Sequence, residues 1–352
     1  MITHLLITGG CGFIGSNFIR YALAERPDWQ LTNLDCMSYS ANAENLADVA
    51  DDARYRFVEG SICDAALVDR LVAGCDGVIH FAAESHVDRS IIDARPFIDS
   101  NVAGTQTLLD AVRRHDDPVR RMVHVSTDEV YGELPLEPTD ARFREDTPIA
   151  PNSPYAASKA ASDLLVRAAH RTFGLDVLIT RCSNNFGPYQ FPEKVVPLFV
   201  TNLIEDRKVP LYGDGLNVRD WIHVLDHCEA VAAVFERGAR GAVYNIGADN
   251  ERTNLELTQM ILDAMGRGPE MIERVTDRPG HDRRYAIDSS RIQGELGWRP
   301  TRSQWPEALE DTVRWYVEHE QWWRRVKSGE YREYYERQYR GRGDHQGSAS
   351  RG

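Results

Sequence analysis

The chain has 352 residues, of which 42% are hydrophobic and 9% aromatic, enough to bury one large core or two unequal domains. Lys and Arg total 41 against 54 Asp and Glu, so the net charge of -13 disfavours nucleic acid as a partner. The six cysteines lack CxxC spacing, which predicts reduced thiols. The sequence starts without a basic leader and has no apolar run of roughly 20 residues, so we expect a soluble, cytoplasmic protein.

Short apolar runs alternate with helical stretches in the first half of the chain. The runs lie at 4–8, 31–35, 55–60, 77–83, 121–126 and 175–181. This alternation is typical of βαβ units. It predicts an α/β fold with a doubly wound parallel sheet of the Rossmann type, contained mainly in residues 1–182.

The spacing loosens after residue 182. A loop rich in Pro and Gly is followed by amphipathic segments near 194–206, 226–237 and 254–265 with short strands between them. We expect residues 183–340 to form mainly a smaller C-terminal substrate-binding domain, with a crossing back into the first domain. Residues 341–352, almost free of apolar side chains, are predicted to be disordered. In the aromatic run 315–323, we interpret Trp315, Val317 and Trp322 as helix-packing residues.

The stretch 5–23 combines a strand, a glycine turn and a helix. Gly9, Gly12 and Gly15 recur at intervals of three, which permits a tight turn and brings a pyrophosphate close to the helix N-terminus. Asp35 follows 20 residues after Gly15, at the end of the next strand. Its carboxylate would accept hydrogen bonds from ribose hydroxyls and repel a 2′-phosphate. The pattern therefore predicts NAD rather than NADP, whereas a glycine turn alone would only indicate tight packing.

A second motif places Tyr155 and Lys159 four residues apart at the start of an amphipathic helix, on one helix face. A free phenol has a pKa of about 10, and a neighbouring ammonium group favours the phenolate. We therefore expect Lys159 to lower the pKa of Tyr155, which would accept a proton from a sugar hydroxyl. Thr127 is expected to hydrogen-bond the same oxygen. Without the dinucleotide motif, such a pair would be interpreted as two surface residues without a catalytic role.

Two acidic residues, Asp128 and Glu129, follow directly after the apolar run at 121–126. One interpretation is a solvated turn between strand and loop. The other is a pair of carboxyl groups in different protonation states, because an elimination of water needs both a base and an acid. Carboxyl groups this close raise each other's proton affinity, so their titrations are coupled.

Together these motifs resemble the extended short-chain dehydrogenase/reductase family, whose members carry this glycine pattern and a Tyr-x-x-x-Lys pair. Five stretches narrow the resemblance to the dTDP-glucose 4,6-dehydratases, over residues from about 5 to 300. These stretches are 82–90, 126–132, 184–194, 212–227 and 278–288. The acidic pair ahead of the tyrosine is the most specific part, since related epimerases and decarboxylases need no such pair.

The resemblance implies a lyase that converts dTDP-glucose to dTDP-4-keto-6-deoxyglucose for deoxysugar biosynthesis. C4 is oxidised, water is lost across C5 and C6 with Asp128 as acid and Glu129 as base, and the hydride returns to C6. Tightly bound NAD would thus be regenerated in each turnover. The catalytic residues implied are Thr127, Asp128, Glu129, Tyr155 and Lys159.

The resemblance also implies two sets of contacts. The cofactor contacts are Gly9, Gly12, Phe13, Ile14, Gly15, Asp35, Cys36, Met37, Ser38, Ser61, Ile62, Phe81, Ala82, Ala83, Ser85, Ser100, Tyr155, Lys159 and Asn185. The substrate contacts are Ser85, Thr127, Asn184, Lys194, Val195, Pro210, Leu211, Tyr212, Arg219, Asn254, Arg278 and His281. The family commonly has Lys-Leu-Thr at 36–38 and Asp-Ile at 61–62, whereas this chain has Cys36-Met37-Ser38 and Ser61-Ile62. We therefore expect the adenine ring of the cofactor to be bound by different contacts.

His86 and Asp88 form a pair that could suggest a metal site. They lack a third ligand at recognisable spacing, so we predict a hydrogen-bonded turn and no metal. Apolar faces near 95–115 and 155–173 predict a homodimer, because related enzymes pair such helices.

Two alternative functions stay open: an epimerase or a dehydratase for another nucleotide-sugar, and a dinucleotide-sensing protein on the same fold. A sensor would need none of the five catalytic residues.

Overall fold

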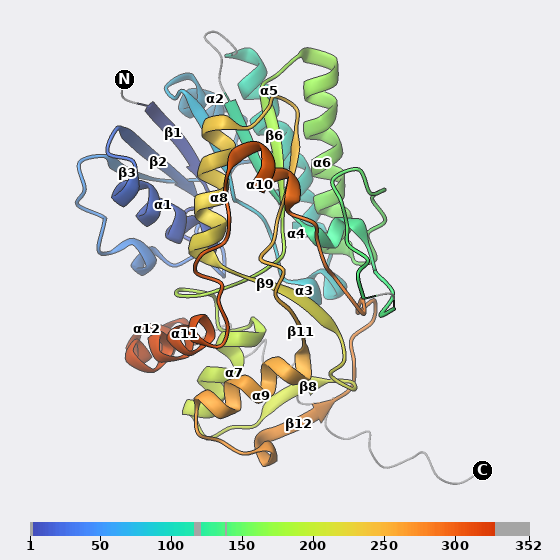
Figure 1. Cartoon of the computed structure of the whole chain (residues 1–352). Coiled ribbons are helices and arrows are strands. Elements are labelled where there is room, and N and C mark those ends of the chain that lie inside the picture. Colours follow the sequence, from blue (N-terminus) through green and yellow to red (C-terminus); the bar gives the residue numbers. More distant parts are fainter. Residues whose placement is uncertain (1–2, 116–120, 138, 328–352) are drawn as a thin grey trace.

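The computed structural model describes residues 3–115, 121–137 and 139–327 (Figure 1). The predicted tail at 341–352, and residues 328–340 of the predicted second domain, lie outside these residues. Figure 1 shows an upper lobe built on a large sheet and a lower lobe that contains α7, α9, β8 and β12.

A seven-stranded parallel sheet forms the upper lobe, in the order β10-β6-β5-β4-β1-β2-β3. Its strands are β1 (Thr3–Thr8), β2 (Trp29–Asp35), β3 (Tyr55–Glu59), β4 (Gly77–His80), β5 (Arg121–Thr127), β6 (Val177–Cys182) and β10 (Val243–Ile246). All six predicted apolar runs are strands of this sheet, so the predicted fold class is confirmed. The seventh strand, β10, comes from the later part of the chain and was not predicted as a sheet member.

Helices cover both faces of the sheet, which explains why its strands are apolar throughout instead of alternating. The flanking helices are α1 (Phe13–Glu25), α2 (Ala65–Ala73), α5 (Thr105–Arg114), α6 (Pro154–Phe173), α8 (Val224–Arg237) and α10 (Ser290–Leu296). Leu5 and Ile7 of β1 pack into the core with α1 and α8, whereas Leu6 between them packs into the core with α2, α5 and α6.

The predicted helix near 95–115 is interrupted. The segment contains α4 (Arg95–Phe97), a π-helix η2 (Ile98–Gly104) and α5, and it follows α3 (Val87–Ile92). Within the π-helix, the amide of Asn101 accepts a hydrogen bond from the backbone N–H of Glu84 at 2.9 Å and donates one to the Glu84 carbonyl at 3.0 Å. The wider turn thus accompanies a side chain that satisfies the backbone of the 82–90 stretch.

The lower lobe has its own core and two small sheets. One sheet has the order β11-β9-β7 and the other pairs β12 with β8. The lower lobe contains β7 (Asn184–Phe186), α7 (Val195–Ile204), β8 (Val209–Tyr212), β9 (Val218–His223), β11 (Glu251–Thr253), α9 (Asn254–Ala264), the short turn η4 (Pro269–Met271), β12 (Ile272–Val275), α11 (Glu307–Glu318) and α12 (Glu320–Val326). A further short turn, η1 (Ala43–Leu46), contacts α1.

The aromatic run at 315–323 is divided between α11 and α12 at His319. Trp322 is buried and Trp315 packs against the same lower-lobe core, as predicted. The prediction for Val317 is wrong, since its side chain is 49% exposed. Val317 lies in the last turn of α11, outside the face that buries Val313 and Tyr316.

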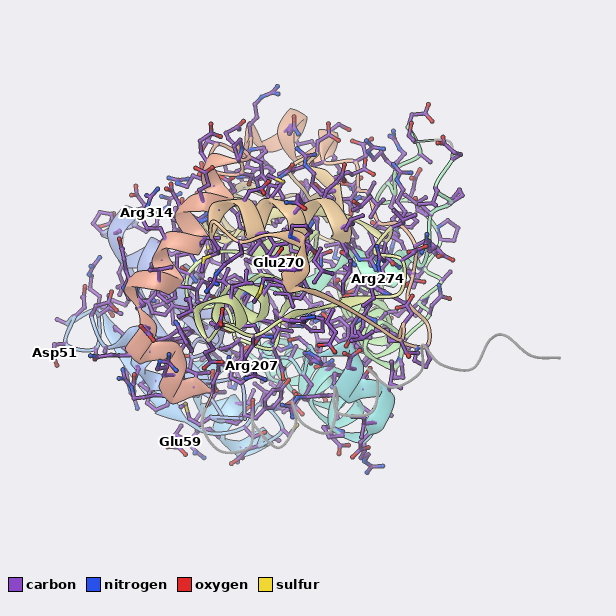
Figure 2. All side chains as sticks on the ribbon, turned by 90° about the horizontal axis from the view of Figure 1, so that it is seen from below. Asp51, Glu59, Arg207, Glu270, Arg274 and Arg314 are labelled. Atoms are coloured by element: carbon purple, nitrogen blue, oxygen red, sulfur yellow. The ribbon has the colours of Figure 1, made fainter. Side chains whose placement is uncertain are left out.

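Charged side chains occur on the surface of both lobes. All six that are labelled in Figure 2 are exposed and come from several elements. Charged groups of both signs are also buried, among them Asp128, Lys159 and Arg219. Within the described ranges, no helix is both long and apolar enough to cross a lipid bilayer.

Candidate active site

The carboxyl ends of the parallel strands open into a cavity of about 450 Å³, which is the usual location for ligands in open α/β sheets. Every predicted cofactor contact except Met37 lines this cavity, as do all five predicted catalytic residues. Met37 lies outside it: its side chain packs against the hydrophobic core, and its backbone N–H donates to Asp35 at 2.9 Å. The structure thus brings together residues spread from Gly9 to Asn185.

The glycine turn at the end of β1 is built for close approach. Gly9 has a φ of +75°, and a Cβ there would lie 2.6 Å from the Ala82 backbone. A Cβ on Gly15 would lie 2.3 Å from the Gly9 carbonyl oxygen. Helix α1 begins at Phe13 without a side-chain cap or an acidic residue in its first turn, so its N-terminal N–H groups face the cavity unshielded. This arrangement suits a pyrophosphate.

Asp35 at the end of β2 is 6% exposed and lines the same cavity. Its two carboxylate oxygens accept hydrogen bonds from the backbone N–H groups of Cys11 and Met37, both at 2.9 Å. Burial raises the pKa of Asp35, and these two hydrogen bonds oppose the rise. Each oxygen keeps further acceptor capacity, so the residue fits the predicted contact with ribose hydroxyls.

Helix α6 positions the Tyr155 and Lys159 pair. The helix begins at Pro154, and the Ser153 hydroxyl caps it by accepting a hydrogen bond from the Ala156 N–H at 3.1 Å. Lys159 donates from Nζ to the Val125 carbonyl oxygen at 2.8 Å, which ties the helix to β5. Both side chains are buried and line the cavity.

The pKa of Tyr155 is raised, not lowered as expected from its spacing to Lys159. Burial, followed by the charges of Glu129, Cys182 and Asp128, raises the pKa of Tyr155 well above 10. The Thr127 hydroxyl, which hydrogen-bonds the phenol, is the group that opposes the rise. Burial also lowers the pKa of Lys159 to about 8. The sequence gives the spacing of the pair but not the depth at which it is buried.

The acidic pair forms the start of a 3-10 turn, η3 (Asp128–Tyr131), directly after β5. The Thr127 hydroxyl accepts from the Glu129 N–H and donates to Asp128 Oδ1, both at 3.3 Å. Asp128 is only 2% exposed, and Asp128 Oδ2 has no hydrogen-bond partner among the described residues. A solvated turn is therefore excluded for Asp128.

The two carboxyl groups have different electrostatic surroundings. Burial, then the carboxyl groups of Glu129 and Asp220, raise the pKa of Asp128 well above 3.8. Burial also raises the pKa of Glu129, but the nearby cations Arg278, Lys194 and Arg219 oppose that rise. Both pKa values are raised, but the rise is large at Asp128 and is opposed by three cations at Glu129, so Asp128 is the better proton donor of the pair and Glu129 the better acceptor.

A second cavity of about 160 Å³ adjoins the first, and the two share Glu129, Asn184, Glu193 and Lys194. It is lined by the remaining predicted substrate contacts: Val195, Pro210, Leu211, Tyr212, Arg219, Asn254, Arg278 and His281. Ser85 and Thr127 line the larger cavity. All twelve predicted substrate contacts therefore line one connected region.

Arg219 is held in the smaller cavity by backbone carbonyls. It donates to Val218 O at 2.7 Å and to Asp282 O at 2.8 Å, and its guanidinium lies 4.2 Å from the Tyr285 ring centroid. The residue is 5% exposed. These contacts orient the guanidinium, and no carboxylate in the described part of the chain hydrogen-bonds it. Arg219 is therefore suited to bind an anionic ligand.

Asp88, considered above for a metal, contacts cations and donors instead. It accepts a hydrogen bond from the Tyr212 hydroxyl at 3.0 Å and lies 3.4 Å from Arg278 Nη1. His86 also lines the smaller cavity. In the ranges described, no three His, Cys, Asp or Glu side chains are grouped as metal ligands would be.

The sequence motifs did not indicate a cluster of four aromatic and charged side chains at the larger cavity. Arg89 stacks 3.7 Å from the Tyr39 ring centroid and donates to Glu193 Oε2 at 3.0 Å, while Phe191 meets Tyr39 edge-on at 5.7 Å. Tyr39, Phe191 and Glu193 line the cavity. Three of the four residues lie in the 82–90 and 184–194 stretches, so the charge and aromatic content of those loops was an available signal.

Comparisons with known proteins agree with this geometry. A profile described as GDP-mannose 4,6 dehydratase matches residues 6–311. A dTDP-glucose 4,6-dehydratase from Streptomyces niveus is 52% identical over 329 residues, covering 92% of this chain and 96% of the relative. The dTDP-glucose 4,6-dehydratase of Streptomyces venezuelae, solved with NAD and dTDP bound, has a TM-score of 0.88 and 52% identity, covering 92% of this chain and 100% of that one.

A UDP-glucose 4-epimerase from Thermotoga maritima, solved with UDP-glucose, also shares the fold, with a TM-score of 0.81 and 27% identity over 90% of this chain and 99% of that one. The parallel sheet, the glycine turn and the Tyr155 and Lys159 pair define an extended short-chain dehydrogenase/reductase. Within that class, the chain belongs to the dTDP-glucose 4,6-dehydratase family. The resemblance stated from the sequence is thereby confirmed.

Proposed function

We propose that this enzyme dehydrates dTDP-glucose to dTDP-4-keto-6-deoxyglucose, a step in deoxysugar biosynthesis. One observation carries the proposal: a buried carboxyl group whose pKa is raised well above its ordinary value adjoins a second one whose pKa rise is opposed by three nearby cations. The pair lies where the two cavities meet. An epimerase or a dinucleotide sensor has no use for such an arrangement.

The larger cavity fits NAD, since a glycine turn, an open helix N-terminus and Asp35 occur together there. NAD, when bound, supplies a hydride acceptor for C4 and later returns the hydride to C6. Tyr155 accepts the proton of the C4 hydroxyl as a phenolate, a form that burial disfavours and that the Thr127 hydroxyl and the Lys159 ammonium group, one turn along α6, favour. Glu129 removes the C5 proton, and Asp128 donates a proton to the leaving C6 hydroxyl.

Oxidation must come first because the C4 ketone acidifies the C5 proton. When the hydride returns to C6, C5 regains a proton from Glu129. The net change is loss of one water: the proton that Tyr155 took from the C4 hydroxyl replaces, through solvent, the one that Asp128 gave to the leaving group, and the cofactor ends in its starting form. Tight retention of NAD follows, because dissociation between half-reactions would strand the reduced cofactor.

The smaller cavity binds the nucleotide diphosphate in this proposal. Arg219 and Arg278 would pair with phosphate oxygens, and Lys194, Val195, Pro210, Leu211 and Tyr212 would surround the nucleoside. The preference for dTDP over GDP is supported by the 52% identity to the Streptomyces enzymes, whereas the broader profile is described by a GDP-sugar.

Incubation of the NAD-loaded protein with a panel of dTDP-, UDP- and GDP-hexoses, followed by mass spectrometry, tests the assignment. We expect loss of water from dTDP-glucose and little from the other sugars. Isomerisation without a mass change would support an epimerase instead. Loss of water from GDP-mannose in preference to dTDP-glucose would reassign the substrate.

We also propose a cytoplasmic homodimer. Large apolar side chains are exposed on the side of η2 and α6, including Ile98, Leu164 and Phe173, each about half exposed. Helices α5 and α6 pack together and lie on the sheet face that η2 also borders. Light scattering should give twice the chain mass of 39.8 kDa, and Leu164→Arg should shift it toward one chain mass.

A further inference from the structure

Behind the Tyr155 and Lys159 pair lies a closed group of polar side chains that the motifs did not indicate. His124 is on β5, Asp163 is one helical turn after Lys159 on α6, and Arg181 is on β6. Lys159, His124, Asp163 and Arg181 are 3%, 0%, 2% and 5% exposed. Charged groups at this depth are retained only when they are paired.

The group forms a chain of contacts. Lys159 Nζ lies 3.4 Å from His124 Nε2, and the same Nε2 lies 3.5 Å from Asp163 Oδ1. Asp163 Oδ2 accepts a hydrogen bond from Arg181 Nε at 2.9 Å. The carboxylate is therefore fixed by Arg181, and it meets the lysine ammonium group at one imidazole atom, His124 Nε2.

His124 is neutral in this setting. Burial, then the charge of Lys159, lower the pKa of His124 to about 4, although Asp163 opposes the fall. A neutral ring can accept from the Lys159 ammonium only if Nε2 is unprotonated and the proton is on Nδ1. Among the residues described, His124 Nδ1 has no hydrogen-bond partner, so the polar contacts of the ring are those of Nε2 with Lys159 and Asp163.

We propose that Asp163, acting with His124, is a positioning residue that holds Lys159 as an ammonium group beside Tyr155. The inference rests on the proposed function, in which a cation must offset the charge that forms on the phenol. It assigns a task to a carboxylate and an imidazole that the reaction scheme does not otherwise use.

The electrostatic surroundings of Lys159 support the proposal. Burial lowers the pKa of Lys159 to about 8, and the opposing influences are Asp163 first and then Cys182 on β6. Without the carboxylate, the balance would move further toward neutral lysine. Such a lysine would no longer stabilise a phenolate whose formation burial already disfavours.

The other ionisable groups around this network are its neighbours on three strands and on α6. His80 on β4 packs 5.2 Å from the His124 ring and joins Thr8 and Thr105 by hydrogen bonds at 2.7 and 3.0 Å. Arg181 is engaged by Asp163 and also lies 4.7 Å from the Tyr131 ring centroid. Tyr155 completes the set on α6. None of these contributes a second carboxylate that could replace Asp163.

The sparse lysine content permits a direct test. The chain has only four lysines, at 159, 194, 208 and 327. NMR of [15N]lysine-labelled, NAD-loaded protein should give four resolvable side chains, with Lys159 assigned by its loss in Lys159→Met. In Asp163→Asn we expect the Lys159 titration midpoint to fall by about one pH unit or more, since an opposite charge at this range shifts a pKa by roughly that amount.

A second buried pair provides the matched control. Lys327 Nζ contacts Glu205 Oε2 at 2.8 Å and Lys327 is 5% exposed. Glu205→Gln should lower the midpoint of Lys327 and leave that of Lys159 unchanged. Asp163→Glu, which keeps the charge, should keep the Lys159 midpoint near its original value.

The pH dependence of the reaction rate tests the same proposal independently. The rate of NAD reduction in a single turnover with dTDP-glucose should fall on the alkaline side as Lys159 loses its proton. Removing a negative charge destabilises the ammonium form, so this alkaline limb should move to lower pH in Asp163→Asn. His124→Leu, which removes the acceptor, should move it more than His124→Gln, which retains one.

The outcomes separate the two proposals. If the unaltered enzyme forms no NADH with dTDP-glucose, the proposed function fails, while the lysine titration still tests the role of Asp163. If Asp163→Asn misfolds because Arg181 is left unpaired, Asp163→Asn combined with Arg181→Gln removes both charges. The midpoint should still fall there, because Asp163 is the group that acts on Lys159. A folded variant with an unchanged Lys159 midpoint overturns the inference.

Discussion

The two adjoining cavities are assembled in different ways. The larger one is lined by residues at the carboxyl ends of strands of the parallel sheet, such as Asp35 and Thr127, which end their strands, and Gly9, which follows one. The smaller one combines the 82–90 stretch with β8, β9 and the loop around Arg278 and His281. The larger cavity holds acidic groups whose pKa values are raised, and the smaller one supplies cations.

This difference teaches that chemistry and binding are separated in space. In the proposed function, residues of the larger cavity act on the reacting hexose or the cofactor, whereas the cations of the smaller one hold the diphosphate. Substitutions in the first should therefore change rates, and substitutions in the second should change affinity. The predictions below test that separation, beginning with the largest expected effect.

Tyr155→Phe should lower the rate of NAD reduction by about 10²- to 10⁴-fold, since the base for the C4 hydroxyl is removed. Substrate affinity should change little because the smaller cavity is intact. Stopped-flow absorbance of bound NADH measures the rate, and calorimetry measures the affinity. A large loss of affinity with a normal rate would invert the proposed separation.

Arg219→Ala should weaken dTDP-glucose binding by about 2 to 5 kcal/mol, because it removes a buried, charge-assisted contact. NAD content should be unchanged, since Arg219 does not line the larger cavity. The exposed Arg274 on β12, labelled in Figure 2, provides the control: Arg274→Ala should leave affinity as it was. Equal affinity of Arg219→Ala and the parent would remove Arg219 from the anion site.

Asp35 should give the smallest effect of the three, a preference for NAD over NADP of about tenfold or more in the nucleotide-stripped protein. Asp35→Asn should narrow that preference, since the charge that repels a 2′-phosphate is lost. Competitive titration of the two nucleotides measures the ratio. Equal binding of NAD and NADP to the parent protein would show that Asp35 does not face the ribose.

The sequence predicted most of what is local. The glycine turn, the Tyr155 and Lys159 spacing and the apolar strands follow from short-range stereochemistry and periodicity. Strand β10 was missed because its four residues join β6 from more than 60 positions away, which no local pattern encodes.

The raised pKa of Tyr155 was missed for a related reason. Its main cause is burial, and the depth of a side chain depends on how η3, β6 and α6 pack. Asp163 and Arg181 were likewise invisible, since their pairing joins a helix to a neighbouring strand. Motifs thus predicted which groups react, and tertiary packing determines their protonation.

The central claim is that Asp128 and Glu129 divide the acid and base work of the elimination. The most direct measurement follows one turnover of Asp128→Asn and of Glu129→Gln by rapid-scan absorbance with quenched mass analysis in deuterated solvent. Both variants should form bound NADH and a 4-keto hexose but lose water slowly, and Glu129→Gln should also incorporate deuterium at C5 far more slowly than the parent. Dehydration at the parental rate in both variants would contradict the account and favour an epimerase.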